Sequence, residues 1–172
     1  MTGLSLTGWV QMYLCRSWQS MLFKDLSIAF IRARALEGET RRMTQDRTII
    51  FVCEHGAAKS IIAAAYFNGL AEEWNLNMRA IARGTIPDQE LSPEVVEGLR
   101  QDGLMPAESV PQKLTLTEFA SAETIVSFCE LPEEYEPKTA LEQWNDIPPV
   151  SQDYDKARDA IIFHIKTLVA NL

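Results

Sequence analysis

The fold is decided by residues 48–60, which read TIIFVCEHGAAKS. The run TIIFV is entirely β-branched or aromatic, as is typical of a strand that is buried on both faces of a parallel sheet. An alanine-rich stretch follows over residues 58–74 and predicts a helix. The loop over residues 53–60 is therefore expected to turn tightly from the carboxyl end of a buried strand into the start of a helix.

The rest of the chain continues this alternation. Further strands are predicted at 78–82, 124–128 and 141–144, and helices at 92–103, from 115 and at 153–170. This order predicts an α/β domain over residues 47–172, with a four-stranded parallel sheet and helices on both faces. Ligands bind outside the carboxyl ends of the strands in such folds. Cys53, the 83–85 turn and Cys129 are therefore expected at one edge of the sheet.

Residues 1–46 differ from this domain. They mix apolar residues with arginines, so they contain no run long enough for a transmembrane segment, and they lack the layout of a secretory signal. Three interpretations remain open: a surface helix, an amphipathic helix at a membrane interface, or an N-terminal extension that is not needed for the fold. Met43 would serve as an alternative start just before the first strand.

Composition excludes some classes of partner. Seven Lys and Arg and four Asp and Glu fall in residues 1–47, which leaves nine basic and twenty acidic residues in 48–172. An acidic domain is not expected to bind nucleic acid through its surface, so an anion site must be local. The three cysteines form no CxxC pair, which predicts a reducing compartment such as the cytoplasm. No cluster of residues has metal-ligand spacing, and no cofactor is expected.

The loop after the first strand has the features of an anion site. A tight turn from strand to helix leaves backbone N–H groups pointing inward, where they can hold a phosphate, and Gly56 lets the backbone bend. The same amides would stabilise a thiolate nucleophile at Cys53. Lys59 adds a positive charge, and Ser60 can donate its hydroxyl to the sulfur. The predicted phosphate-binding residues are Glu54, His55, Gly56, Ala57, Ala58 and Lys59.

This Cys-x5-cation-Ser loop after an Ile/Phe-rich strand resembles that of the low-molecular-weight protein tyrosine phosphatases and the related arsenate reductases. The resemblance extends over about residues 48–170, including Gly84-Thr85, the Ser92-Pro93 helix start and the strand that ends in Phe128-Cys129. It implies the three-layer fold of that superfamily. It also implies hydrolysis of a phosphomonoester, either a small molecule or a phosphoprotein, through a cysteinyl-phosphate intermediate and without a cofactor.

Two departures from the family pattern bear on activity. The family has Arg where this chain has Lys59, and an ammonium lacks the planar fork that contacts two oxyanion oxygens. By analogy with the loss of an oxyanion-hole donor, this change would slow phosphoryl transfer by roughly 30- to 1000-fold. The family's general acid is an Asp, but alignment from Trp144 puts Pro148 in its place, and Asp146, the candidate acid here, lies two residues earlier.

Two alternative functions therefore stay open. One is an arsenate reductase that uses an external thiol, because Cys129 has no second cysteine a few residues downstream to complete an internal relay. The other is a catalytically weak module that binds phosphate. Cys129 itself is expected to be structural. Trp144 and Tyr154 would either line the mouth of the site or pack beside it, and the sequence leaves the oligomeric state open.

Overall fold

The parallel sheet predicted from the sequence is present. The computed structural model describes residues 47–135 and 141–172, so the predicted N-terminal extension over 1–46 lies outside the described residues. Four strands, all parallel, pair in the order β2-β1-β3-β4. Their bounds are β1 Arg47–Cys53, β2 Met78–Gly84, β3 Thr124–Ser127 and β4 Leu141–Gln143.

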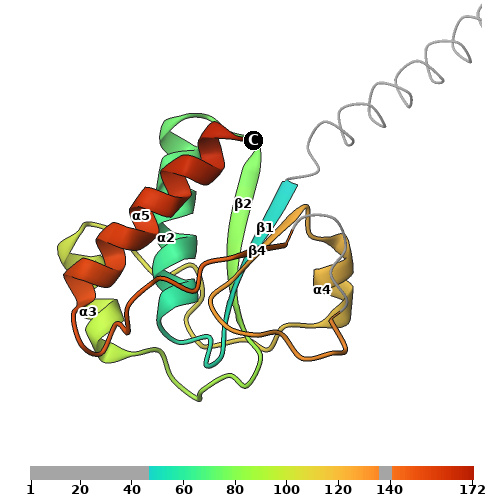
Figure 1. The fold of residues 1–172 in the computed structure, drawn as a ribbon. Coiled ribbons are helices and arrows are strands. Elements are labelled where there is room, and N and C mark those ends of the chain that lie inside the picture. Colours follow the sequence, from blue (N-terminus) through green and yellow to red (C-terminus); the bar gives the residue numbers. More distant parts are fainter. Residues whose placement is uncertain (1–46, 136–140) are drawn as a thin grey trace, which may run out of the picture. The chain divides into compact units, whose positions relative to one another are not determined.

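Helices cover both faces of this sheet, as predicted. Their bounds are α2 Lys59–Glu73, α3 Pro93–Gln101, α4 Leu116–Ser121 and α5 Tyr154–Ala170. In Figure 1, α2, α3 and α5 lie on one side of the sheet and α4 lies on the other. Among the described residues, none of the helices has the length and hydropathy needed to span a bilayer.

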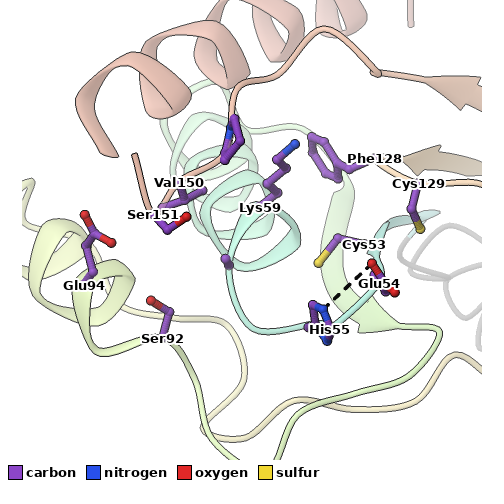
Figure 2. A pocket seen from close by; sticks show the side chains of 12 residues that line it. Cys53, Glu54, His55, Lys59, Ser92, Glu94, Phe128, Cys129, Val150 and Ser151 are labelled. Atoms are coloured by element: carbon purple, nitrogen blue, oxygen red, sulfur yellow. Dashed lines mark ion pairs between the residues drawn. The ribbon is translucent and has the colours of Figure 1, made fainter. Parts of the chain in front are cut away.

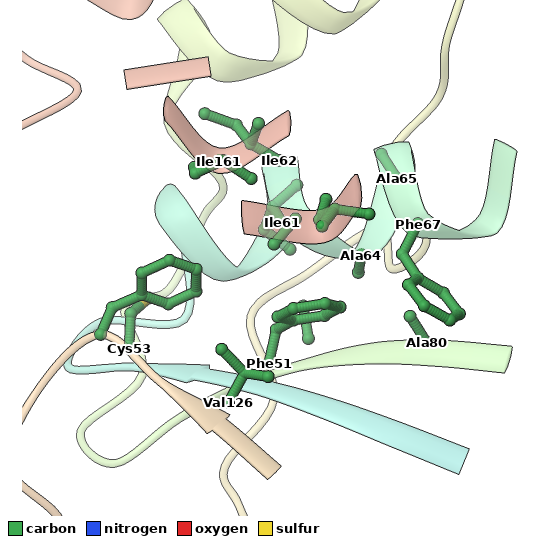
Figure 3. Close-up of a cluster of buried hydrophobic side chains, with 14 of the residues drawn as sticks. Phe51, Cys53, Ile61, Ile62, Ala64, Ala65, Phe67, Ala80, Val126 and Ile161 are labelled. Atoms are coloured by element: carbon green, nitrogen blue, oxygen red, sulfur yellow. The ribbon is translucent and has the colours of Figure 1, made fainter. Parts of the chain in front are cut away.

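Strand β1 lies at the centre of the sheet and contributes alternate side chains to two cores. Ile49 and Phe51 face α2 and α5 and belong to the larger cluster, part of which is drawn in Figure 3. Ile50 and Val52 face the opposite way and pack with Phe119 of α4. These four β1 side chains are at most 1% exposed, so burial on both faces accounts for the unbroken apolar run in the sequence.

Element boundaries differ from the predictions by one or two residues, mostly because of pairing. Strand β2 continues past Ala82 because Gly84 still pairs with Cys53 of β1. Helix α3 stops at Gln101, and Gly103, expected as the end, lies just beyond it with φ +74°. Trp74, the last residue of the helix predicted over 58–74, lies just beyond the end of α2 and is 49% exposed.

Candidate active site

Cys53 ends strand β1 at the point where the sheet order reverses. Its neighbours in the sheet are β2 on one side and β3 on the other, so the loop that follows β1 opens at the carboxyl edge. The Cys53 side chain is buried, and its Sγ lies 3.1 Å from the Oγ of Ser60, which is fully buried in the first turn of α2. The predicted contact between Ser60 and the sulfur is therefore present.

Four of the carbonyls of residues 53–57 are bonded to a neighbouring segment of the chain. Four N–H groups of residues 85–92 donate to them at 2.8–3.1 Å, namely Thr85 to Cys53, Ile86 to Glu54, Asp88 to His55 and Ser92 to Ala57. In the described part of the chain, the N–H groups of residues 54–59 donate no backbone–backbone hydrogen bond. These N–H groups are thus left for an anion beside Cys53.

Two glycines let the loop and β2 approach each other closely. Gly56 has φ +63°, a conformation that side chains other than glycine rarely adopt. A Cβ on Gly56 would lie 2.9 Å from the Gly84 nitrogen, and a Cβ on Gly84 would lie 2.8 Å from the Gly56 nitrogen. The backbone of Gly84 is itself fixed, because it bonds to Gln112 and Leu114. The loop is therefore shaped by a contact between two backbones.

The Lys59 ammonium is hydrogen-bonded to the protein backbone after β4. Its Nζ donates to the carbonyl oxygen of Ile147 at 2.6 Å, and in Figure 2 the side chain extends away from the Cys53 sulfur. Burial lowers the pKa of Lys59, while the nearby Cys53, Cys129 and Asp146 oppose that shift. Lys59 therefore lines the cavity, but its ammonium is hydrogen-bonded to the segment after β4.

Asp146 does not line the cavity beside Cys53. The Nε2 of His164 on α5 donates to its carboxylate at 2.9 Å, and the His164 ring stacks on Trp144. This hydrogen bond lowers the pKa of Asp146, so the carboxyl is ionised at neutral pH. The candidate acid therefore acts on Lys59 through its charge, but its carboxylate is paired with a helix-face histidine and is not among the residues that line the cavity.

The cavity beside Cys53 has a volume of about 390 Å³. Figure 2 shows Ser92 and Glu94 on one side of it and Phe128 and Cys129 on the opposite side. Sequence reasoning missed most of these lining residues, which also include Pro149, Val150 and Ser151. The signal for them was present, because residues 85–94 follow β2, and residues 149–151 follow β4, at the same carboxyl edge as Cys53.

Trp144 and Tyr154 lie outside the cavity, whereas Cys129 lies in its wall. Trp144 is 3% exposed within the core, and the Tyr154 hydroxyl donates to Asp102, so neither lines the cavity. Cys129 does line it as a free thiol, and burial raises the pKa of Cys129. In residues 47–135 and 141–172, no group of three or more His, Cys, Asp or Glu side chains is arranged to hold a metal ion.

The site therefore contains a buried thiol, backbone N–H groups with no backbone acceptor in the described part of the chain, and a partly apolar cavity. Such a site can hold a tetrahedral oxyanion on the amides while the sulfur attacks its central atom. The exposed side chain of His55 lies at the rim, where its Nδ1 is 3.3 Å from the carboxylate of Asp88. The histidine is therefore engaged with a neighbouring acid rather than aimed at the sulfur.

Comparisons with known proteins agree with this arrangement. Residues 48–162 match the sequence model of the low molecular weight phosphotyrosine protein phosphatase family. An arsenate reductase from Archaeoglobus fulgidus is similar in structure, with 25% identity, a TM-score of 0.57 and coverage of 71% of this chain and 98% of that chain. No curated protein sequence matches this chain.

Two tyrosine phosphatase structures share the fold at lower identity. The low molecular weight enzyme from T. tengcongensis has 17% identity and a TM-score of 0.60, and the match covers 73% of this chain and 99% of that chain. The enzyme from Streptococcus pyogenes has 11% identity and a TM-score of 0.62, with coverage of 73% and 93%.

Proposed function

The chain belongs to the low molecular weight phosphotyrosine protein phosphatase family, and on that premise we propose that it hydrolyses a phosphomonoester through a covalent intermediate on Cys53. One observation carries the proposal. Four carbonyls of residues 53–57 accept from N–H groups of residues 85–92. In the described part of the chain, the N–H groups of residues 54–59 donate no backbone–backbone hydrogen bond and so are available to an anion. That geometry suits a phosphate whose phosphorus faces the thiol.

In the proposed reaction, the Cys53 thiolate attacks phosphorus and forms an S–P bond while the P–O bond to the organic group breaks. The leaving oxygen departs with the bonding electron pair and takes up a proton. Water then attacks phosphorus, the S–P bond breaks, and inorganic phosphate leaves with the thiolate restored. Ser60, whose Oγ is 3.1 Å from Sγ, would donate to the sulfur each time it becomes a leaving group. A reducing compartment such as the cytoplasm would keep Cys53 as a thiol.

The charges near the sulfur support a slow enzyme with a preference for good leaving groups. Lys59 would have to exchange its bond to Ile147 for one to the phosphate before it could stabilise developing charge. Asp146 would have to leave His164 and take up a proton before it could act as the general acid. Aryl phosphates need little protonation of the leaving oxygen, so we expect them to be turned over faster than alkyl phosphates.

Turnover of p-nitrophenyl phosphate between pH 5 and 7 tests the proposal. We expect slow turnover by the native chain and a rise of at least roughly tenfold in the Lys59→Arg variant, since a guanidinium can contact two phosphate oxygens at once. Release of p-nitrophenolate, read after alkalisation, measures both rates. A Lys156→Arg variant serves as the matched control, because Lys156 is exposed on α5 and does not line the cavity.

If the native chain and Lys59→Arg are both inert while their folds are intact by circular dichroism, the phosphatase assignment is wrong. A faster Lys59→Arg enzyme would instead mean that the native lysine limits the rate.

A second candidate function is reduction of arsenate with an external thiol. It is favoured by the structural similarity to an arsenate reductase at 25% identity. Cys53 would attack arsenate and displace hydroxide. An external thiol would then attack the Cys53 sulfur, which releases arsenite and leaves a mixed disulfide that a second external thiol reduces. Arsenate-dependent oxidation of glutathione, measured without phosphatase turnover, would favour this function.

A further inference from the structure

The cavity beside Cys53 has carboxylates where the organic part of a substrate would lie. Glu54 follows the nucleophile directly, and Glu94 lies across the cavity on α3, as Figure 2 shows. The apolar part of the cavity lining includes Phe128, Pro149 and Val150. A group attached to a phosphate on the loop amides would therefore contact an apolar surface that is bordered by two acids.

Positive charge in the cavity is scarce and already engaged. Among the described residues that line it, Lys59 is the only Lys or Arg, and its Nζ is bonded to Ile147. His55 faces two acids, with Asp88 at 3.3 Å and Glu54 at 3.8 Å. Within residues 47–135 and 141–172, Glu94 has no ion pair with a protein cation. The Glu94 carboxylate is exposed and is therefore accessible to a cationic group of a ligand.

The net negative charge of the whole domain also favours a positively charged ligand. Residues 48–172 contain nine basic and twenty acidic residues. A cavity lined by charge of one sign attracts ligands of the opposite sign and repels those of the same sign. The phosphate is held locally by backbone amides, but any further negative charge on the substrate meets repulsion from the rim and from the surface around it.

We propose that the substrate is a phosphate ester whose organic part carries a positive charge, an ammonium or guanidinium group that lies against Glu94 and Glu54. This inference rests on the proposed function, because it assigns the substrate class of the same site. The phosphate would occupy the loop, the carbon skeleton would pack on the wall formed by Phe128, Pro149 and Val150, and the cation would reach the rim. An amine-bearing small molecule and a peptide with basic neighbours both meet this description.

Three aryl phosphates with the same ring and different tails test the proposal. Each carries a para-ethyl chain that ends in an ammonium, a hydrogen or a carboxylate, so that the leaving groups are alike and the tail charge differs. We expect kcat/KM to fall in that order, with a ratio of roughly tenfold between the first and last at low ionic strength that shrinks to about twofold near ~0.5 M salt. Phosphotyrosine peptides with Lys or Glu neighbours, compared in the same way, show whether the preferred source is a peptide or a small molecule.

Two variants on α3 distinguish the effect of the cavity carboxylate from the effect of the domain's net charge. Glu94→Gln is expected to reduce the ratio to about threefold or less, since it removes a cavity carboxylate. Glu97→Gln changes the net charge by the same amount but affects a side chain bonded to Arg100 and Gln101, outside the cavity. It should leave the ratio unchanged. An equal effect of the two variants, or a ratio that is flat or reversed in the native chain, would overturn the proposal.

Binding to the Cys53→Ser variant, measured by calorimetry, keeps this test separate from the proposed function. If the native chain is inert but the variant binds the ammonium compound most tightly, the phosphatase reaction is wrong and the charge preference stands. If turnover occurs without any charge preference, the reaction stands and the charge preference is wrong. If none of the three compounds is bound or hydrolysed, both are wrong.

Discussion

Replacing Cys53 with Ser is expected to abolish turnover of p-nitrophenyl phosphate, by a factor on the order of 10⁴ or more. A serine hydroxyl is not ionised at neutral pH and is a far weaker nucleophile than a thiolate. The substitution is otherwise conservative, because an oxygen in place of Sγ still lies near the Ser60 hydroxyl, which is 3.1 Å from the native sulfur. Initial rates at saturating substrate, with thermal unfolding of both proteins, provide the measurement.

Cys129→Ser is the matched control for this experiment. Cys129 lines the same cavity, yet burial raises its pKa and so disfavours its thiolate at neutral pH. We expect the control to keep most of the activity. Loss of activity in Cys129→Ser with retention in Cys53→Ser would mean that the nucleophile has been assigned to the wrong cysteine.

Replacing Gly84 with Ala is expected to disrupt the loop from the side of β2. The new Cβ would lie 2.8 Å from the Gly56 nitrogen and 3.0 Å from its Cα, and both are backbone atoms that cannot rotate away. Gly84 cannot easily retreat either, because its own N–H and carbonyl bond to Gln112 and Leu114. We expect a loss of about 1–3 kcal/mol in the free energy of unfolding, as is usual for overpacking, together with loss of phosphate binding.

Gly69→Ala is the corresponding control in helix α2. Its Cβ would meet only the Leu104 Cδ2 at 3.4 Å, an ordinary contact, and alanine favours a helix interior by up to about 1 kcal/mol over glycine. Urea denaturation and calorimetric titration with phosphate give the two readouts for each variant. A Gly84→Ala protein that binds phosphate like the native chain would show that the contact between Gly56 and Gly84 does not shape the loop.

The fold was predictable because its signals are local. The apolar run of β1, the alanine-rich start of α2 and the Ser92-Pro93 helix start each specify an element within a few residues. The parallel arrangement then follows from their alternation. The position of Cys53 beside Ser60 was predictable for the same reason, since the two residues are only seven positions apart.

The features of the site that were not predictable depend on contacts distant in sequence. Lys59 donates to a carbonyl that is 88 residues away in the sequence. The residues around Lys59 do not indicate which acceptor its flexible ammonium will choose. The His164 partner of Asp146 comes from a different element and depends on how α5 packs. Glu94 reaches the cavity only because the 85–92 segment runs alongside the loop.

Alkylation of the native chain with iodoacetamide measures whether the loop after Cys53 binds an oxyanion beside the thiol. Mass spectrometry of the peptides follows the rate at Cys53 with and without inorganic phosphate, and chloride at matched ionic strength is the control. We predict that phosphate slows alkylation of Cys53 at least several-fold while chloride does not, because the anion covers the sulfur. An equal rate of Cys53 alkylation in saturating phosphate and in chloride would contradict the claim.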